Sequence, residues 1–259
     1  MDRRKMLKMT GTALLGTALL GPSVFAGEAD KTEKKESKKS RKPKALIIGA
    51  HPDDPETGCG GTMLALKKAG YEVVAIYMTK GEGGIVGKSH DEAAAIRVPE
   101  AKAACKILGV KPIFLTQIDG NTEINKARYV EMREAIAAEQ PDIVFTHWPI
   151  DSHPDHRVCS LLVYDAWRRL GYNFELYYYE VMSGLQSQLY QPTDWVDISE
   201  FADQKYEACC CHVSQGMADI YEWHHDMERF RGRELRCKRA EAFIHLRRDD
   251  SDILPASEE

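Results

Sequence analysis

Two short segments of the sequence combine histidines with carboxylates. Residues 50–56 read AHPDDPE, and residues 147–156 read HWPIDSHPDH. Imidazole nitrogens and carboxylate oxygens bind divalent transition metals, and three protein ligands with an open position are typical of a catalytic zinc site. A single His-Pro-Asp segment is more often a turn in which the Asp side chain bonds nearby amides. Two such segments, each directly after an apolar run, favour a metal site.

The elements that must position these segments alternate between strand and helix. Apolar runs predict buried strands at 45–50, 71–78, 113–115, 142–147 and 175–181, and helical patterns lie at 57–70, 91–109, 129–141 and 158–166. This alternation predicts an α/β fold: a doubly wound, Rossmann-like, mostly parallel sheet with helices on both faces. Pro99 is expected to start or kink its helix because proline lacks the amide that an interior turn needs. The histidine segments then follow the first and fourth strands, at the edge where such sheets bind ligands.

The sequence after Ser183 is more polar and richer in helical pattern. We expect Ser199 to cap a helix that extends from Ala202 to Val213, because a serine hydroxyl accepts hydrogen bonds from the first amides of a helix. Residues 240–246 are predicted as a last strand. No repeat or second linker interrupts the pattern, so residues 43–259 are predicted to form one domain.

The amino terminus has the three zones of a secretory signal: a basic start, an apolar middle and small residues before position 27. The apolar stretch is shorter than the roughly 20 residues that span a bilayer, so residues 1–26 are predicted to be cleaved and to leave no membrane span. Arg3-Arg4 resembles the twin-arginine export motif, with an ordinary basic signal as the alternative. Residues 27–42 are predicted to be a charged, disordered linker. The protein is thus expected to be exported, to the periplasm or outside the cell.

The composition excludes some classes of partner and chemistry. The net charge is −5, and four basic side chains lie within the first eight residues, so the rest of the chain lacks the positive charge that nucleic-acid binding demands. The glycines at 58–61 do not have the Gly-x-Gly-x-x-Gly spacing of a dinucleotide loop, and no Gly-x-Ser-x-Gly motif of a serine hydrolase occurs. The seven cysteines are odd in number and three are contiguous, so no disulfide is predicted.

Three further histidine positions have simpler interpretations. His147 is interpreted as a strand-end residue, and His224-His225 as a packed or solvated pair, because adjacent histidines on a helix point in different directions. His212 is placed at the end of a helix, where a capping role and a site role are equally consistent with the pattern.

The two histidine segments carry a resemblance to a known family. Together with GCGGT at 58–62, GEGG at 81–84, RVPE at 97–100, DG at 119–120 and HVSQ at 212–215, they resemble the PIG-L/LmbE-like zinc-dependent N-acetylglucosamine deacetylases. The likeness extends from Ala45 to about Gln215, and its two histidine motifs are specific. It implies that His51, Asp54 and His156 are the zinc ligands.

The resemblance also implies roles for five other residues. Asp53 would be the general base, His153 would stabilise the tetrahedral intermediate, and Asp155 would be the carboxylate that steers His153 and raises its pKa. Arg97 and Asp119 would contact the sugar. This division of labour suits amide hydrolysis, which needs an activated water, a polarised carbonyl and a proton for the departing amine.

We therefore expect an exported hydrolase that removes acetyl from an N-acetylated amino sugar or a glycoconjugate. Zinc (Zn2+) is the expected metal, with Fe2+ or Co2+ as alternatives. One rival function is hydrolysis of a non-sugar N-acyl amide by the same site. Another is metal-dependent sugar binding without catalysis, against which the presence of Asp53 argues, because binding alone needs no base.

Overall fold

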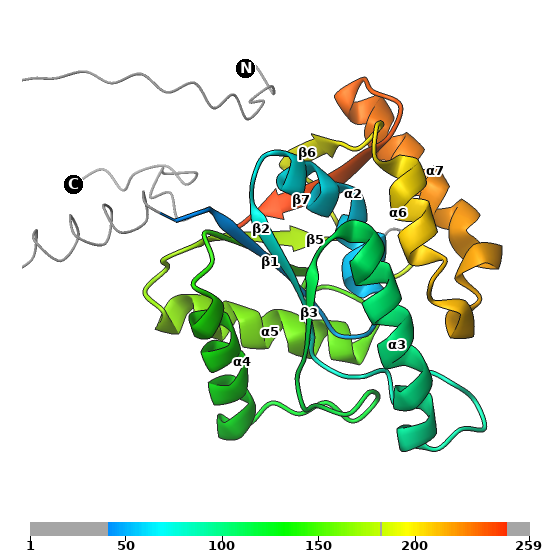
Figure 1. Cartoon of the computed structure of the whole chain (residues 1–259). Coiled ribbons are helices and arrows are strands. Elements are labelled where there is room, and N and C mark those ends of the chain that lie inside the picture. Colours follow the sequence, from blue (N-terminus) through cyan, green and yellow to red (C-terminus); the bar gives the residue numbers. More distant parts are fainter. Residues whose placement is uncertain (1–40, 182, 248–259) are drawn as a thin grey trace, which may run out of the picture. The chain divides into compact units, whose positions relative to one another are not determined.

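The structure, a computed structural model, describes residues 41–181 and 183–247. Within this part of the chain, one sheet has the strand order β3-β2-β1-β4-β5-β7-β6 (Figure 1). The strands are β1 (Lys44–Gly49), β2 (Glu72–Tyr77), β3 (Lys111–Phe114), β4 (Ile143–His147), β5 (Glu175–Tyr179), β6 (Asp194–Asp197) and β7 (Ala240–His245). Neighbours from β3 to β5 are parallel, and β7 is antiparallel to both β5 and β6. The predicted mostly parallel, doubly wound fold is confirmed.

Helices cover both faces of the sheet (Figure 1). They are α2 (Asp54–Lys68), α3 (His90–Leu108), α4 (Lys126–Glu139), α5 (Pro154–Arg169), α6 (Ala202–Cys209), the 3-10 turn η1 (Val213–Gln215) and α7 (Met217–Leu235). Alternate side chains of β1 enter two separate cores, as the two-residue period of a strand requires. Leu46 and Ile48 pack with α4 and α5, whereas Ala45 and Ile47 pack with α2, α3 and α6.

The predicted site lies at the carboxyl ends of β1 and β4, in the middle of the sheet. These two strands are hydrogen-bonded neighbours, and the chain continues from β1 to β2 and β3 on one side and from β4 to β5 on the other. The strand order therefore reverses direction at this point, where open α/β sheets bind ligands outside the carboxyl ends of their strands. Both histidine segments begin at this point.

Local sequence determines where the neighbouring helices begin. Ser89 and Glu92 form a capping box at the start of α3, and Gly109, with a φ of 67°, ends that helix. Pro99 lies inside α3, so it does not start the helix, and the predicted alternative, a kink at this residue, stays a prediction. α2 begins at Asp54, three residues before the predicted start, because the sequence Asp54-Pro55 supplies a proline for the first turn.

The carboxyl-terminal part differs most from the prediction. The chain places Ser199 outside α6, where its hydroxyl donates to Asp197, and the N-cap residue is Phe201. Cys209 ends α6, so Val213 belongs to the separate turn η1. Strand β6 was not predicted, because its four residues hold only two apolar side chains and have no alternating pattern long enough to identify.

The predicted signal peptide at residues 1–26 lies outside the described residues, as does the linker at 27–42 except for its last two positions. Of the described residues, those from Pro43 onward cluster as one unit. Among the described helices, none combines the length and the apolar character that crossing a bilayer requires.

Candidate active site

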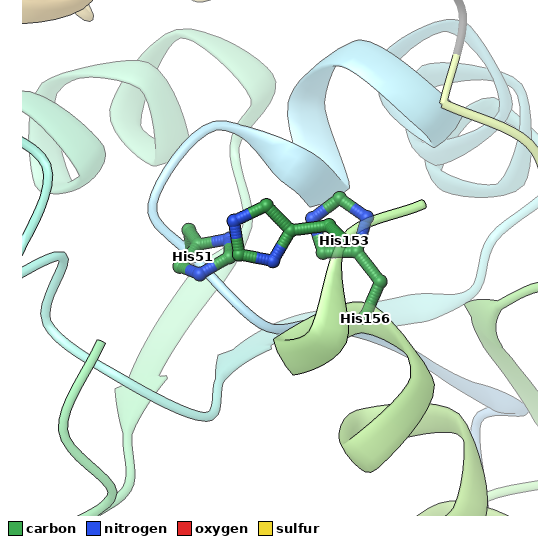
Figure 2. Close-up of side chains that lie close together, drawn as sticks. All are labelled: His51, His153 and His156. Atoms are coloured by element: carbon green, nitrogen blue, oxygen red, sulfur yellow. The ribbon is translucent and has the colours of Figure 1, made fainter. Parts of the chain in front are cut away.

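The candidate site forms where β1 and β4 end side by side. β1 leads into His51, and α2 begins at Asp54. β4 leads into the loop before α5, whose N-cap residue is His153 and whose first turn contains His156. Figure 2 shows the rings of His51, His153 and His156 together, the first from the β1 loop and the other two from the start of α5. Loops about a hundred residues apart in sequence thus meet at one place.

Asp54 lies between the other two predicted ligands. Its Oδ2 is 3.2 Å from Nδ1 of His51, and its Oδ1 is 3.3 Å from Nε2 of His156. All three side chains are buried. Donor atoms about 2.1 Å from a tetrahedral zinc lie about 3.4 Å from one another. The two nitrogens and the carboxylate have the chemistry that a divalent cation requires, and Asp54 is at a suitable distance from each histidine, but through different oxygens. The ligand assignment stays a prediction.

Further donors surround this triad. The structure holds three overlapping groups that could bind a metal ion: His51 with His153 and His156, Asp54 with His147 and His156, and His51 with Asp119 and Asp155. Each contains one or two members of the predicted triad. The carboxylates of Asp54, Asp119 and Asp155 all lie within 3.2 Å of a ring nitrogen of His51. Although burial opposes it, their hydrogen bonds raise the pKa of His51 well above its usual value. The negative charge of these three carboxylates favours the binding of a cation at this place.

Asp53 is adjacent to the ligands but directed elsewhere. Its Oδ2 accepts a hydrogen bond of 3.0 Å from Nη2 of Arg97, and it belongs to none of the three donor groups. Its backbone has a φ of 121°, which a residue other than glycine rarely adopts. Burial raises the pKa of this carboxyl, although the charge of Arg97 opposes the shift. A carboxylate beside the donor groups, with a raised pKa, has the position and chemistry of a proton acceptor.

The two predicted sugar contacts also lie at the site. Asp119 places Oδ1 3.1 Å from Nε2 of His51, and its Oδ2 is 3.6 Å from Nη1 of Arg97. Arg97 is only 3% exposed, so it offers a sugar little surface. Its Nη2 also donates to the carbonyl of Pro52 at 2.5 Å. The structure thus directs Arg97 at the loop that contains Asp53.

The structure corrects the predicted pairing of Asp155 with His153. The Asp155 carboxylate contacts Nε2 of His51 at 3.1 Å and accepts hydrogen bonds from Gly120 and Thr122. The difference arises from helix geometry: Asp155 follows the N-cap by two positions, and it is its backbone amide that donates to Nδ1 of His153. Burial would raise the pKa of Asp155, but the hydrogen bonds from His51, Thr122 and Gly120 hold it well below its usual value.

The pKa of His153 is lowered overall, although Asp155 acts on it in the predicted direction. Burial lowers its pKa, and the neighbouring His51 and His156 lower it further, which outweighs Asp155. The ring centroids of His153 and His51 are 4.7 Å apart. Since Nδ1 accepts an amide hydrogen, the neutral ring carries its proton on Nε2 and can donate it. His153 therefore remains a hydrogen-bond donor without a positive charge.

His147 and Asp151 are site residues to which sequence reasoning assigned no such role. His147 Nε2 lies 3.2 Å from Asp54 Oδ2, and Asp151 Oδ1 lies 3.1 Å from Nδ1 of His156. Asp151 therefore contacts a predicted ligand in the way that partners that orient metal ligands do. His147 belongs to one of the three donor groups, and its Nε2 accepts a hydrogen bond from the amide of Ala50. Their positions in the sequence could have indicated this role, because His147 ends β4 at the carboxyl edge of the sheet and Asp151 lies in the loop that follows.

The remaining polar candidates lie outside the three donor groups. His224 packs against the Tyr221 ring, and His225 pairs with Glu222, in agreement with the interpretation of a packed or solvated pair. His212 is fully buried, with Nε2 3.5 Å from the carboxylate of Glu56, and makes no side-chain cap. Each of the seven cysteines is free.

A doubly wound sheet with clustered histidines and carboxylates at its switch point defines a class of α/β proteins equipped to bind a metal ion. Comparison with known families is more specific. Residues 46–167 match the model of the PIG-L family, described as GlcNAc-PI de-N-acetylase. The chain is also 35% identical over 196 residues to a diacetylchitobiose deacetylase of Thermococcus kodakarensis, covering 69% of this chain and 72% of that protein. The chain belongs to the PIG-L family.

Solved structures agree with this assignment. The N,N'-diacetylchitobiose deacetylase of Pyrococcus horikoshii has a TM-score of 0.70 and 27% identity, covering 88% of this chain and 95% of that chain. A 4-carboxy-2-hydroxymuconate hydratase of Pseudomonas putida has a TM-score of 0.72 at 21% identity, covering 82% of this chain and all of that chain. The second likeness concerns the fold alone. Because one fold hosts different reactions, function has to be argued from the site.

Proposed function

We propose that this protein is a metal-dependent N-deacetylase that hydrolyses the acetamido group of an N-acetylglucosamine-type sugar or glycoconjugate, with zinc as the metal. One observation supports this most directly: Asp54 lies between His51 and His156, while the adjacent Asp53 contacts Arg97 instead of a predicted ligand. Of these two neighbouring carboxylates, Asp54 would therefore serve as a metal ligand and Asp53 as the general base. A site that only bound metal or sugar would have no use for the second carboxylate.

The cation would be held by His51, Asp54 and His156, and when bound it supplies Lewis-acid polarisation of the amide carbonyl and activation of a water. Asp53 accepts the proton of the attacking water and passes it to the departing amine nitrogen. Its raised pKa suits a group that must first take up a proton and then release it. Arg97 keeps this carboxylate at the edge of the cluster.

His153 stabilises the oxyanion that develops on the carbonyl oxygen. Its neutral ring provides an N–H donor, which needs no positive charge to act in this way. Removal of one such donor costs about 3 kcal/mol in comparable sites. Asp119, partly exposed beside His51, supplies a carboxylate that can accept a hydrogen bond from a sugar hydroxyl.

The sugar substrate is supported by the relatives. The family description and the relatives from Thermococcus kodakarensis and Pyrococcus horikoshii all name deacetylases of N-acetylglucosamine-containing compounds. The identity of 35% to the Thermococcus protein extends over most of both chains, beyond the histidine motifs. We therefore favour a small N-acetylglucosaminide over a non-sugar N-acyl amide.

The amino-terminal sequence supports a location outside the cytoplasm. The basic, apolar and small-residue zones of residues 1–26 are those of a cleaved export signal. Sequencing the amino terminus of protein recovered from the periplasm or medium tests this proposal. A mature chain that starts near residue 27 would support it, and an intact Met1 on protein retained in the cytoplasm would contradict it.

The decisive experiment measures acetate release. The purified protein is stripped with a chelator, dialysed, and assayed with N-acetylglucosamine, diacetylchitobiose and a non-sugar N-acetyl amide, with Zn2+, Fe2+ or Co2+ restored separately. We expect activity on the sugars that is lost on stripping and recovered with zinc. Sugar binding without acetate release would contradict catalysis, and turnover of the non-sugar amide alone would contradict the substrate class.

A further inference from the structure

Arg97 contacts both the backbone and the side chain of the loop that precedes α2. Nη2 donates to the carbonyl oxygen of Pro52 at 2.5 Å and to Oδ2 of Asp53 at 3.0 Å. Arg97 extends from α3, and its side chain is 3% exposed. One nitrogen of a buried guanidinium therefore links two successive residues of the loop.

The residue that Arg97 contacts is conformationally strained. Asp53 has a φ of 121° and a ψ of −29°, a region that residues with a Cβ avoid, and no side-chain hydrogen bond caps the helix at this position. Such a conformation is energetically unfavourable and persists only where surrounding contacts enforce it. Arg97 binds the carbonyl of Pro52, which precedes the strained φ angle, and the side chain of Asp53, which follows it, and so holds both ends of this bond in place.

Two glycines make room for this arginine. A Cβ on Gly84 would lie 2.1 Å from Nη1 of Arg97, and a Cβ on Gly81 would lie 2.6 Å from its Cδ and Nη1. Gly81 also has a φ of 73°, which itself favours glycine. The Gly81-Glu82-Gly83-Gly84 segment is therefore shaped around the guanidinium rather than around a ligand.

The glycine segment is itself fixed in place. Glu82, which is buried, accepts hydrogen bonds from the amides of Lys80 and Asp119. The carbonyl of Gly84 accepts a hydrogen bond of 3.2 Å from Nε2 of Gln215. Neither contact involves a predicted metal ligand. These hydrogen bonds anchor the loop that packs against Arg97 on the side opposite its contacts with Pro52 and Asp53.

We propose that Arg97 is a positioning residue that holds the general base Asp53 in its strained conformation, and that Gly81 and Gly84 form the cradle that Arg97 requires. This inference rests on the proposed deacetylase function. It differs from the sugar contact that the resemblance implied, because a sugar contact affects substrate affinity, whereas loss of positioning reduces turnover. It also assigns a purpose to the GEGG segment.

The test uses the full-length, zinc-loaded protein and compares Arg97→Ala and Gly84→Ala with wild type. A small misplacement of a catalytic group costs on the order of 100-fold in rate, so we expect Arg97→Ala to lose about that much kcat with KM changed less than threefold. Added methylguanidinium chloride should restore part of the lost kcat, and sodium chloride of equal concentration should not. Zinc content should equal that of wild type.

Gly84→Ala tests the same contact without removing the arginine. The added methyl group displaces Nη1, so kcat should fall at least tenfold at unchanged zinc content. Val86→Ala is the control in the same loop, because the Val86 side chain is fully exposed, and it should match wild type. A kcat for Arg97→Ala within threefold of wild type, or a fully active Gly84→Ala variant, would overturn the inference. An inactive wild-type protein would instead contradict the proposed function.

Discussion

The imidazole rings of His147 and His156 lie face to face, with centroids 3.9 Å apart and planes 8° apart. His147 is fully buried at the end of β4, and its Nε2 contacts Asp54 Oδ2 and the hydroxyl of Tyr179. Burial and the charge of His156 together lower its pKa to about 4, so the ring is neutral at pH 7. The neutral ring therefore stacks on one predicted ligand, His156, and its Nε2, which accepts a hydrogen bond from the amide of Ala50, lies beside another, Asp54.

Replacing His147 by phenylalanine should weaken metal binding while the fold is retained. The aromatic ring preserves the stack on His156 but removes the nitrogen that contacts Asp54, and loss of such a supporting contact typically costs 10- to 100-fold in affinity. The measurement is zinc affinity by competition with a chromophoric chelator. His225→Phe, on a helix away from the donor groups, is the matched control. Equal affinities for both variants would contradict a supporting role for His147.

Asp53→Asn should keep the metal and lose turnover. The amide preserves the size of the side chain and can still accept a hydrogen bond from Arg97, but it cannot take a proton from water. We expect kcat to fall by about 100- to 10,000-fold, the usual contribution of a general base. Metal analysis and acetate release on the same sample check this. Loss of zinc in this variant would show that Asp53 is a ligand and not the base.

Lys205 should be essential for stability, although it lies apart from the donor groups. Its Nζ is 3.0 Å from Glu228 and 2.8 Å from Glu241, and all three side chains are fully buried. Lys205→Met leaves uncompensated buried charge, so the free energy of unfolding should fall by about 3–5 kcal/mol. Lys68→Met breaks an exposed pair with Glu200 and should cost about 0–1 kcal/mol. Urea unfolding measures both, and similar losses would refute the distinction.

The buried cluster of Lys205, Glu228 and Glu241 also predicts that the stability of the protein depends on pH. Burial would raise the pKa of Glu228, but Lys205 and Arg239 hold it below its usual value. A lowered folded-state pKa contributes stability above the unfolded-state value of about 4.3, and this contribution is lost as the pH falls through the folded-state pKa. The pKa of Lys205 is raised, so its contribution is already complete below about pH 10 and does not change in this range.

Glu228→Gln isolates that contribution. The difference in unfolding free energy between wild type and variant should be constant from about pH 5 to 8 and should shrink as the pH falls below about 4.3. Urea titrations at several pH values give this difference directly. A difference that stays constant down to the most acidic pH at which both proteins fold would contradict the pKa direction.

Sequence was sufficient for the parallel half of the fold. Strands β1, β2 and β4 are continuous apolar runs between helical patterns, and such runs are characteristic of strands buried on both faces. β6 could not be predicted, because an edge strand of four residues is stabilised by its pairing with β7 rather than by its own pattern. The antiparallel direction of β7 likewise depends on the path of α6 and α7.

The sequence was enough to predict which loops form the site, but not which side chains contact one another within it. The position of His51 and His156 follows from strand ends that meet at the switch point of the sheet. Which carboxylate faces which histidine depends on rotamers and on helix phase, and so Asp155 contacts His51 instead of His153. The support from His147 was missed because a histidine at a strand end has no pattern that distinguishes it from a packing residue.

The strand order divides the donors between two successive stretches of chain. His51 and Asp54 belong to the stretch that builds β1 to β3, and His156 belongs to the stretch that begins with β4. A polypeptide severed between α4 and β4 would yield two fragments, neither with a full coordination set. If His51, Asp54 and His156 hold a metal ion as predicted, reassembly of the fragments would depend on the concentration of that ion, which would link the two parts of the molecule as well as take part in the reaction.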